Sequence, residues 1–301
     1  MVRGLEVPND LALADVCGAT LAYRAIGTGE PVVFVHGSIS DLTTRDRQLP
    51  AVGARFRAIA YSRRYAWPND DLARGERDTM APHVDDLLAF LRAAQAYPAH
   101  LVGNSYGAFI CLRAAIREPE AVRSLVLEEP PLVPLVAGNP PSAMRALRTL
   151  IRHPAVTLAM LRFVGGTLRP VQQMVARGEI EASIDRFARG VLGASYDQLP
   201  PDARAHMQAN ASTHVGQVLA DGGFDPITEP DIRGVRTPAL VVIGAESPPM
   251  FRRLAALLAS LLPNGQRLTV PQASHAMHLQ NPDALNAGLL AFLEPQPTAS
   301  R

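Results

Sequence analysis

The chain has 301 residues, of which 48% are hydrophobic and 19% are charged. This length is enough for one large domain or two small ones, and the hydrophobic content supports a sizeable core. The 29 Lys and Arg residues nearly balance the 28 Asp and Glu residues, so the net charge of +1 argues against a nucleic-acid partner.

The sequence contains no sign of a membrane span or an export signal. No apolar run approaches the roughly 18 residues that a span needs, and the N-terminal stretch lacks the apolar segment of a signal peptide. The two cysteines, Cys17 and Cys111, are too few for a disulfide framework. We therefore expect a cytoplasmic protein.

Short apolar runs alternate with segments of helical periodicity along the chain. Residues 11–26 predict one or two strands, and further strands are predicted at 31–35, 55–61, 99–102, 122–127, 238–243 and 266–270. A helix that Thr79 can cap, a helix after residue 105, a helix over 249–262 and a last helix after Pro282 lie between or beyond these strands. This alternation predicts an α/β fold with a mostly parallel central sheet flanked by helices.

Residues 132–231 interrupt the alternation with a helical pattern and no convincing strand. We interpret this segment as a helical cap inserted after the sixth strand, so that residues 1–131 and 232–301 form the core. Between residues 141 and 189, eight arginines stand against three acidic residues. A solvated helical face explains this excess, and an anionic ligand or a membrane surface is the alternative.

The stretch Gly103-Asn104-Ser105-Tyr106-Gly107 lies where a predicted strand turns directly into a helix. Such a turn forces the central serine into strained backbone angles, and the flanking glycines let strand and helix approach closely. The hydroxyl is then presented at a helix N-terminus, which favours developing negative charge. The stretch therefore predicts a nucleophile elbow.

In an open α/β sheet, ligands bind beyond the carboxyl ends of the strands. Polar residues of this chain gather at those predicted ends, namely His36-Gly37-Ser38, Ser105, Glu128-Glu129, Gly244 to Glu246 and Ser274-His275. A serine needs an adjacent base to become a nucleophile, and His275 follows the last predicted strand. We expect these residues to form one site.

This pattern resembles the α/β-hydrolase superfamily over nearly the whole chain. The resemblance rests on the His36-Gly37 turn, the elbow, and His275 ahead of the final helix. It implies that Ser105 is the nucleophile, that His275 is its base, and that the backbone amides of Ser38 and Tyr106 form an oxyanion hole. His36 is expected to brace its turn, and His278 to pack or to line the pocket.

The acidic partner of His275 stays open between several candidates. Most superfamily members place an aspartate where this chain has Ser247, and Glu246 is shifted from that position by one residue. Haloalkane dehalogenases and zearalenone lactonases instead place the acid directly after the strand that follows the elbow helix. Glu129 matches this second position, 24 residues after Ser105. We favour Glu129 over Glu246, with Glu128 and Asp225 as further candidates.

A serine nucleophile implies acyl chemistry, so we expect a hydrolase that cleaves a small-molecule carboxylic ester or lactone through an acyl-enzyme, without metal or other cofactor. Carbon–carbon bond hydrolysis and acyl transfer use the same residues and stay open, as does a non-catalytic receptor with this fold. The sequence is also compatible with a homodimer. Tyr65 and Trp67 follow a strand's carboxyl end, where they would either wall the pocket or pack their own loop.

Overall fold

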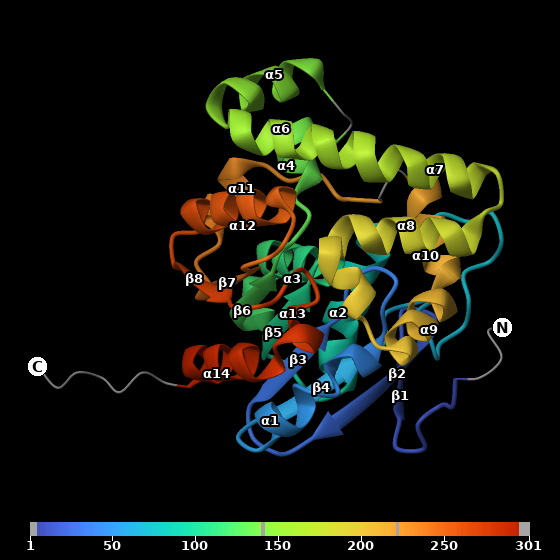
Figure 1. The fold of residues 1–301 in the computed structure, drawn as a ribbon. Helices are drawn as coiled ribbons and strands as arrows, with labels where there is room; N and C mark the ends of the chain where they lie inside the picture. The colour runs from blue at the N-terminus through green and yellow to red at the C-terminus, as the bar shows by residue number, and fades with distance from the viewer. Residues whose placement is uncertain (1–4, 140–141, 221–222, 295–301) are drawn as a thin grey trace, which may run out of the picture.

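The computed structural model describes residues 5–139, 142–220 and 223–294. An eight-stranded sheet runs through its centre, as Figure 1 shows. The strands are β1 (Ala12–Val16), β2 (Ala19–Ile26), β3 (Pro31–Val35), β4 (Arg57–Tyr61), β5 (Ala99–Asn104), β6 (Val122–Glu128), β7 (Ala239–Gly244) and β8 (Gly265–Val270).

The strands lie in the order β1-β2-β4-β3-β5-β6-β7-β8. Strand β2 pairs antiparallel with both of its neighbours, β1 and β4. All neighbouring strands from β4 across to β8 pair parallel. The prediction of a mostly parallel sheet is therefore confirmed, and each predicted strand exists within a few residues of its expected bounds.

Helices surround this sheet and extend the fold beyond its carboxyl edge. They are α1 (Leu49–Gly53), α2 (Met80–Ala93), α3 (Tyr106–Arg117), α4 (Val133–Ala137), α5 (Ala143–Arg152), α6 (Pro154–Phe163), α7 (Arg169–Ala176), α8 (Ile180–Leu192), α9 (Pro201–Ala209), α10 (Ala211–Leu219), α11 (Glu229–Gly234), α12 (Pro249–Leu261), α13 (Met277–Gln280) and α14 (Pro282–Leu293). Shorter turns of 3-10 helix lie at Leu42–Arg45, Pro119–Ala121 and Gly193–Gln198, and a π-helical turn lies at Val164–Leu168.

The two faces of the sheet are buried by different helices, because side chains alternate along a strand. In β3, Val33 and Val35 pack in one hydrophobic cluster with α2, α3 and α12. Val32 and Phe34 pack in a second cluster with α1 and α14. Both faces are thus covered, which explains why the parallel strands read as continuous apolar runs.

Helix α2 begins where the sequence predicts, but not for the predicted reason. Thr79 occupies the N-cap position, and its side chain makes no capping hydrogen bond. The amide of Met80 instead donates to the carbonyl of Gly223 at 2.8 Å. The start of this helix is therefore held by a segment far away in the sequence.

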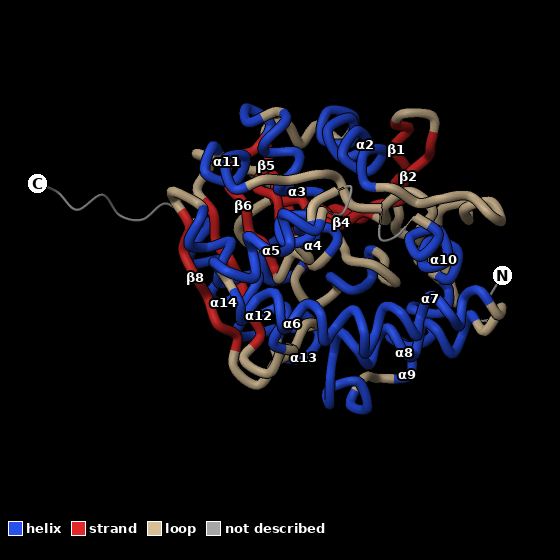
Figure 2. The backbone as a smooth tube through the Cα atoms, turned by 90° about the horizontal axis from the view of Figure 1, so that it is seen from above, coloured by secondary structure: helices blue, strands red, loops and turns tan. Residues whose placement is uncertain are grey.

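The segment between β6 and β7 contains helices α4 to α11 and, among its described residues, no strand. Helices α7 to α10 pack against one another, and Figure 2 shows them along one side of the molecule. Apolar side chains of this segment, among them Ile184 and Val191, belong to the same hydrophobic cluster as α3 and α12. Its treatment as a separate cap domain remains a prediction. No helix in the described part of the chain is long and apolar enough to cross a membrane.

Candidate active site

Ser105 sits at a sharp turn between β5 and α3. Its φ of 52° is positive, as the elbow prediction requires, although its ψ of −120° lies outside the left-handed helical region. The turn leaves no room for side chains on the flanking glycines. A Cβ on Gly103 would lie 2.5 Å from the Cα of Ala108, and one on Gly107 would lie 2.2 Å from the carbonyl oxygen of Val35. The predicted elbow is therefore present.

The structure brings His275 and Glu129 together. Nδ1 of His275 lies 2.7 Å from Oε2 of Glu129, and the amide of Gly244 donates to Oε1 of the same carboxylate at 2.9 Å. The Phe251 ring lies against the imidazole with 4.0 Å between centroids. Nε2 of His275 is buried and makes no hydrogen bond to the described residues. The carboxylate thus orients the ring and leaves Nε2 as the nitrogen available to a reacting group.

The other acidic candidates lie elsewhere. Glu246 is exposed, and the carboxylate of Asp225 lies 3.5 Å from Arg113. Glu128 turns away from His275 and forms a bidentate pair with Arg45, at 2.9 and 3.0 Å. Ser247 is buried, but its hydroxyl has no partner among the described residues. Of the carboxylates weighed from the sequence, Glu129 is the one hydrogen-bonded to His275.

The ion pair between Arg45 and Glu128, the residue that precedes Glu129, is fully buried. Burial alone would raise the pKa of Glu128, but the charge of Arg45 outweighs it and holds the pKa at about 2. His278 lies 3.7 Å from the same carboxylate, and burial together with the charge of Arg45 lowers its pKa to about 4. Two adjacent glutamates are tolerated here because each has its own partner.

The turn at His36-Gly37-Ser38 lies against the elbow. A Cβ on Gly37 would lie 3.2 Å from the Cβ of Ser105. The neutral ring of His36 is held at both nitrogens, since Nδ1 donates to the Gly37 carbonyl at 2.9 Å and Nε2 accepts from the Arg63 amide at 2.8 Å. Burial lowers the pKa of His36 well below its usual value. These contacts are those of a brace, as expected from the sequence.

The two amides named for the oxyanion hole flank Ser105. Tyr106 is the first residue of α3, so its N–H has no acceptor within the helix. Ser38 follows Gly37, and both Ser38 and Tyr106 line a cavity together with Ser105. Backbone donors at this place can receive negative charge that develops on a substrate oxygen.

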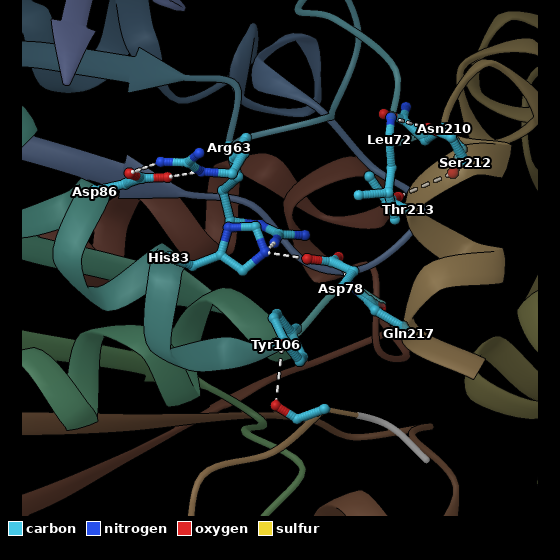
Figure 3. Close-up of polar contacts among 12 residues, drawn as sticks. Arg63, Leu72, Asp78, His83, Asp86, Tyr106, Asn210, Ser212, Thr213 and Gln217 are labelled. Atoms are coloured by element: carbon cyan, nitrogen blue, oxygen red, sulfur yellow. Dashed lines mark hydrogen bonds and ion pairs between the residues drawn. The ribbon is translucent and has the colours of Figure 1, made fainter. Parts of the chain in front are cut away.

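Arg63 is a part of this region that the sequence reasoning missed. Its guanidinium donates to the carbonyls of His36 and Gly37, at 3.2 and 2.9 Å, and lies 5.1 Å from the ring centroid of Tyr106. Figure 3 shows Arg63 beside His83, whose Nε2 lies 2.6 Å from a carboxylate oxygen of Asp78. Arg63 thus fixes the turn that carries the Ser38 amide. Its position just after the carboxyl end of β4 was the available signal.

Two cavities meet at Ser105. The larger, of about 490 Å³, is also lined by His275, Asn104, Trp67, His278 and residues of α8 and α9. The smaller, of about 130 Å³, is lined by Tyr106 and by apolar residues of the cap segment and of α12. Ser38, Ser105, Phe187 and Val191 line both. Within the described residues, no group of three or more His, Cys, Asp or Glu side chains is placed to hold a metal ion.

A model of the alpha/beta hydrolase family matches residues 32–287, a range that includes Ser38, Ser105, Tyr106, Glu129 and His275. The chain belongs to the alpha/beta hydrolase family. A non-heme haloperoxidase of Rhodococcus erythropolis is 26% identical over 291 residues, covering 92% of this chain and 97% of that relative. This member of the family is also similar to solved structures of a thermophilic esterase from Thermogutta terrifontis and an enol-lactonase from Burkholderia xenovorans LB400.

The esterase is 18% identical with a TM-score of 0.72, covering 94% of this chain and 97% of the other. The enol-lactonase is 19% identical with a TM-score of 0.70, covering 94% and 99%. At these identities the structures establish the shared α/β-hydrolase fold, while the esterase and lactonase activities belong to those two proteins.

Proposed function

We propose that this α/β hydrolase cleaves a carboxylic ester or lactone through Ser105, His275 and Glu129. The observation that supports the proposal most is the 2.7 Å hydrogen bond from His275 Nδ1 to Glu129 Oε2, beside a cavity that Ser105 also lines. A serine at an elbow, a histidine base and a carboxylate that orients it are the parts that acyl transfer to serine requires.

The proposed reaction has two halves. His275 Nε2 takes the proton of the Ser105 hydroxyl as Oγ attacks the ester carbonyl, and the amides of Ser38 and Tyr106 donate to the resulting oxyanion. The tetrahedral intermediate collapses as His275 protonates the leaving alkoxide, so an acyl-enzyme and a free alcohol form. Water then attacks the acyl-enzyme with His275 again as base, releasing the acid and Ser105.

Glu129 supports both halves without changing its own protonation. Its carboxylate keeps the Nδ1 proton on the side away from Ser105 and stabilises the imidazolium that forms when His275 takes a proton. The second hydrogen bond, from the Gly244 amide, holds the carboxylate in place. The cytoplasmic location, the homodimer and the lack of a nucleic-acid partner remain predictions from the sequence.

The test is hydrolysis of p-nitrophenyl esters from acetate to decanoate and of several lactones, by wild type and by Ser105→Ala. We expect turnover by the wild type and its loss in the folded variant. Near-normal hydrolysis by Ser105→Ala would contradict the mechanism. Silence of the wild type together with cleavage of a vinylogous ketone would favour carbon–carbon bond hydrolysis, and ligand binding without any turnover would favour a receptor.

A further inference from the structure

The two cavities at Ser105 differ in which catalytic group they contain. His275 lines the larger cavity and not the smaller one, whereas Tyr106 lines the smaller and not the larger. Ser105 and Ser38 line both. A substrate whose carbonyl carbon sits at Ser105 therefore extends in two directions, with the histidine on one side only.

The route of the proton decides which half of an ester occupies which cavity. In the first half-reaction His275 must give its proton to the oxygen of the leaving alcohol, so that oxygen lies within hydrogen-bond reach of Nε2. The alcohol half then occupies the larger cavity, and the acyl half is left with the smaller one. We propose that the substrate is an ester of a short apolar acid with a larger polar alcohol that is neutral or cationic. This proposal rests on the ester hydrolysis proposed above.

The smaller cavity suits an uncharged, apolar acyl group. Its lining is mostly apolar and includes Phe163, Leu168, Val171, Phe224, Met250 and Phe251. Two polar side chains that border it have their Nε2 atoms in hydrogen bonds, since Gln217 donates to Asp78 at 2.9 Å and His214 lies 3.0 Å from the Ser183 hydroxyl. Burial lowers the pKa of His214 to about 4, so no charge is offered to an acyl carboxylate.

The size of this cavity limits the acyl chain. Its volume is about 130 Å³, close to the roughly 150 Å³ of an apolar protein cavity that holds benzene. On that scale about four to six carbon atoms fit. Longer chains would have to displace well-packed side chains such as Val171, which is 1% exposed.

The larger cavity presents polar and acidic groups. Its volume is about 490 Å³, and its polar lining includes Thr43, Glu6, Asp46, Arg47, Asp202 and His206. Among the described lining residues the three carboxylates exceed the single arginine, although Asp46 also pairs with Arg24 at 2.8 Å. His206, the lining histidine whose pKa is raised, is hydrogen-bonded to the buried carboxylate of Asp41. Hydroxyl-rich or cationic alcohols gain hydrogen bonds or attraction there, whereas an anionic alcohol is repelled.

The acyl half is tested with ethyl esters of acetate, butyrate, hexanoate and decanoate. We expect kcat/KM to peak at butyrate or hexanoate and to fall at least tenfold for decanoate. Val171→Phe should move the optimum to acetate, and Val171→Ala should raise the relative rate on longer chains. Ala176→Phe, on the exposed side of α7, should change neither the optimal chain length nor the relative rate on longer chains. A decanoate optimum, or an optimum unmoved by both Val171 variants, would overturn the assignment.

The alcohol half is tested with butyrate esters of ethanol, glycerol, choline and glycolate. We expect the glycerol and choline esters to exceed the ethyl ester in kcat/KM, and the glycolate ester to be at least tenfold poorer than the choline ester. Asp202→Lys should reduce the preference for the choline ester over the glycolate ester. Asp70→Lys, at an exposed site outside both cavities, should leave this preference unchanged. Equal rates for all four alcohols would overturn this half while leaving ester hydrolysis itself intact. Loss of all ester cleavage would instead contradict the proposed function.

A second observation, independent of the site, concerns the α5–α6 hairpin. It carries six of the large exposed hydrophobic side chains among the described residues: Met144 (61% exposed), Leu147 (52%), Leu150 (42%), Ile151 (73%), Leu158 (48%) and Leu161 (62%). Residues 132–178 contain six arginines and no acidic residue. Figure 1 shows α5 at the outer end of the molecule, away from the sheet.

We infer that this hairpin docks on the surface of a membrane rich in anionic lipids. Exposed apolar side chains flanked by arginines suit the boundary between headgroups and acyl chains, where both attraction and apolar burial contribute. A symmetric dimer through this hairpin would bring together two segments rich in arginine and free of acidic residues, which disfavours a second copy as the occupant. The structure thus favours the lipid interpretation of the basic segment over a merely solvated face.

The test is co-sedimentation with vesicles of phosphatidylcholine alone or mixed with phosphatidylserine. We expect at least tenfold stronger binding to the mixed vesicles, lost at high salt and lost in the double variant Leu147→Glu/Ile151→Glu. Leu13→Glu, at an exposed apolar position on β1, is the matched control and should bind normally. No binding to either vesicle, or a dimer in solution that the double variant abolishes, would overturn the inference.

Discussion

Replacing Glu129 by glutamine changes one oxygen at the centre of the site. The buried carboxylate accepts from the Gly244 amide at 2.9 Å and faces His275 Nδ1 at 2.7 Å. A glutamine has a single acceptor oxygen, so its NH2 group must face one of these two neighbours. Facing Gly244 it places two donors together, at a cost of about 1–3 kcal/mol. Facing His275 it forces the proton onto Nε2, and the ring can then no longer accept the proton of Ser105.

The expected loss in kcat is about 10⁴-fold, which corresponds to about 5.4 kcal/mol in the activation barrier. Steady-state hydrolysis of p-nitrophenyl butyrate measures it, with a thermal melt to establish that the variant is folded. Glu246→Gln is the matched control, because this exposed carboxylate does not touch His275, and it should stay within about twofold of wild type. A loss below tenfold in Glu129→Gln, or a large loss in Glu246→Gln, would refute the assignment of the acid.

Three further predictions follow from particular contacts. Gly107→Ala should destabilise the fold by about 3 kcal/mol in urea unfolding, because its Cβ would lie 2.2 Å from the Val35 carbonyl oxygen; an effect below about 0.5 kcal/mol would contradict the elbow geometry. Arg63→Met should lower kcat about 100-fold with little change in KM, and Arg63→Lys should retain part of the lost kcat. A change confined to KM would argue against a role of Arg63 in positioning the turn that carries the Ser38 amide. Burial opposes charge on His206, but the hydrogen bond and charge of Asp41 raise its pKa. The difference in Tm between wild type and His206→Gln should therefore be largest below about pH 6.5 and shrink as the pH rises through the raised pKa. A difference that grows with pH would contradict the stabilising interaction between His206 and Asp41.

The elbow and its neighbours could be predicted because their signals are local. Gly103 and Gly107 bracket Ser105 in five residues, and the strand and helix on either side carry clear periodicity. Glu129 was favoured because it resembles, in its position directly after the strand that follows the elbow helix, the acid of haloalkane dehalogenases and zearalenone lactonases. Its contact with His275, 146 residues away, needed the structure.

The residues that the sequence did not reveal act through long-range pairing. Arg45 meets Glu128 across 83 residues, and its side chain is 1% exposed, although arginine is ordinarily a surface residue. Arg63 likewise contributes only after β3 and β4 align side by side in the sheet. The start of α2 was predicted with the wrong cap, since Thr79 supplies no side-chain hydrogen bond and Gly223 supplies the acceptor from a distant segment.

The two cavities illustrate the same limit. They arise where helices α7 to α10 pack over the carboxyl ends of the strands, and no motif in residues 132–231 encodes their volumes. The sequence left open whether Trp67 walls the pocket or packs its own loop. In the structure Trp67 lines the larger cavity. Packing between segments far apart in the sequence decides such features.

The most direct test of the central claim is to trap the acyl-enzyme and find the residue that carries it. Rapid quench of the enzyme with p-nitrophenyl butyrate, followed by peptide mass spectrometry, should place a butyryl group on the peptide that contains Ser105 and on no other. The modification should accumulate during a burst of p-nitrophenol and be absent from Ser105→Ala. A butyryl group on another residue, or hydrolysis that continues with Ser105 unmodified, would contradict Ser105 as the nucleophile.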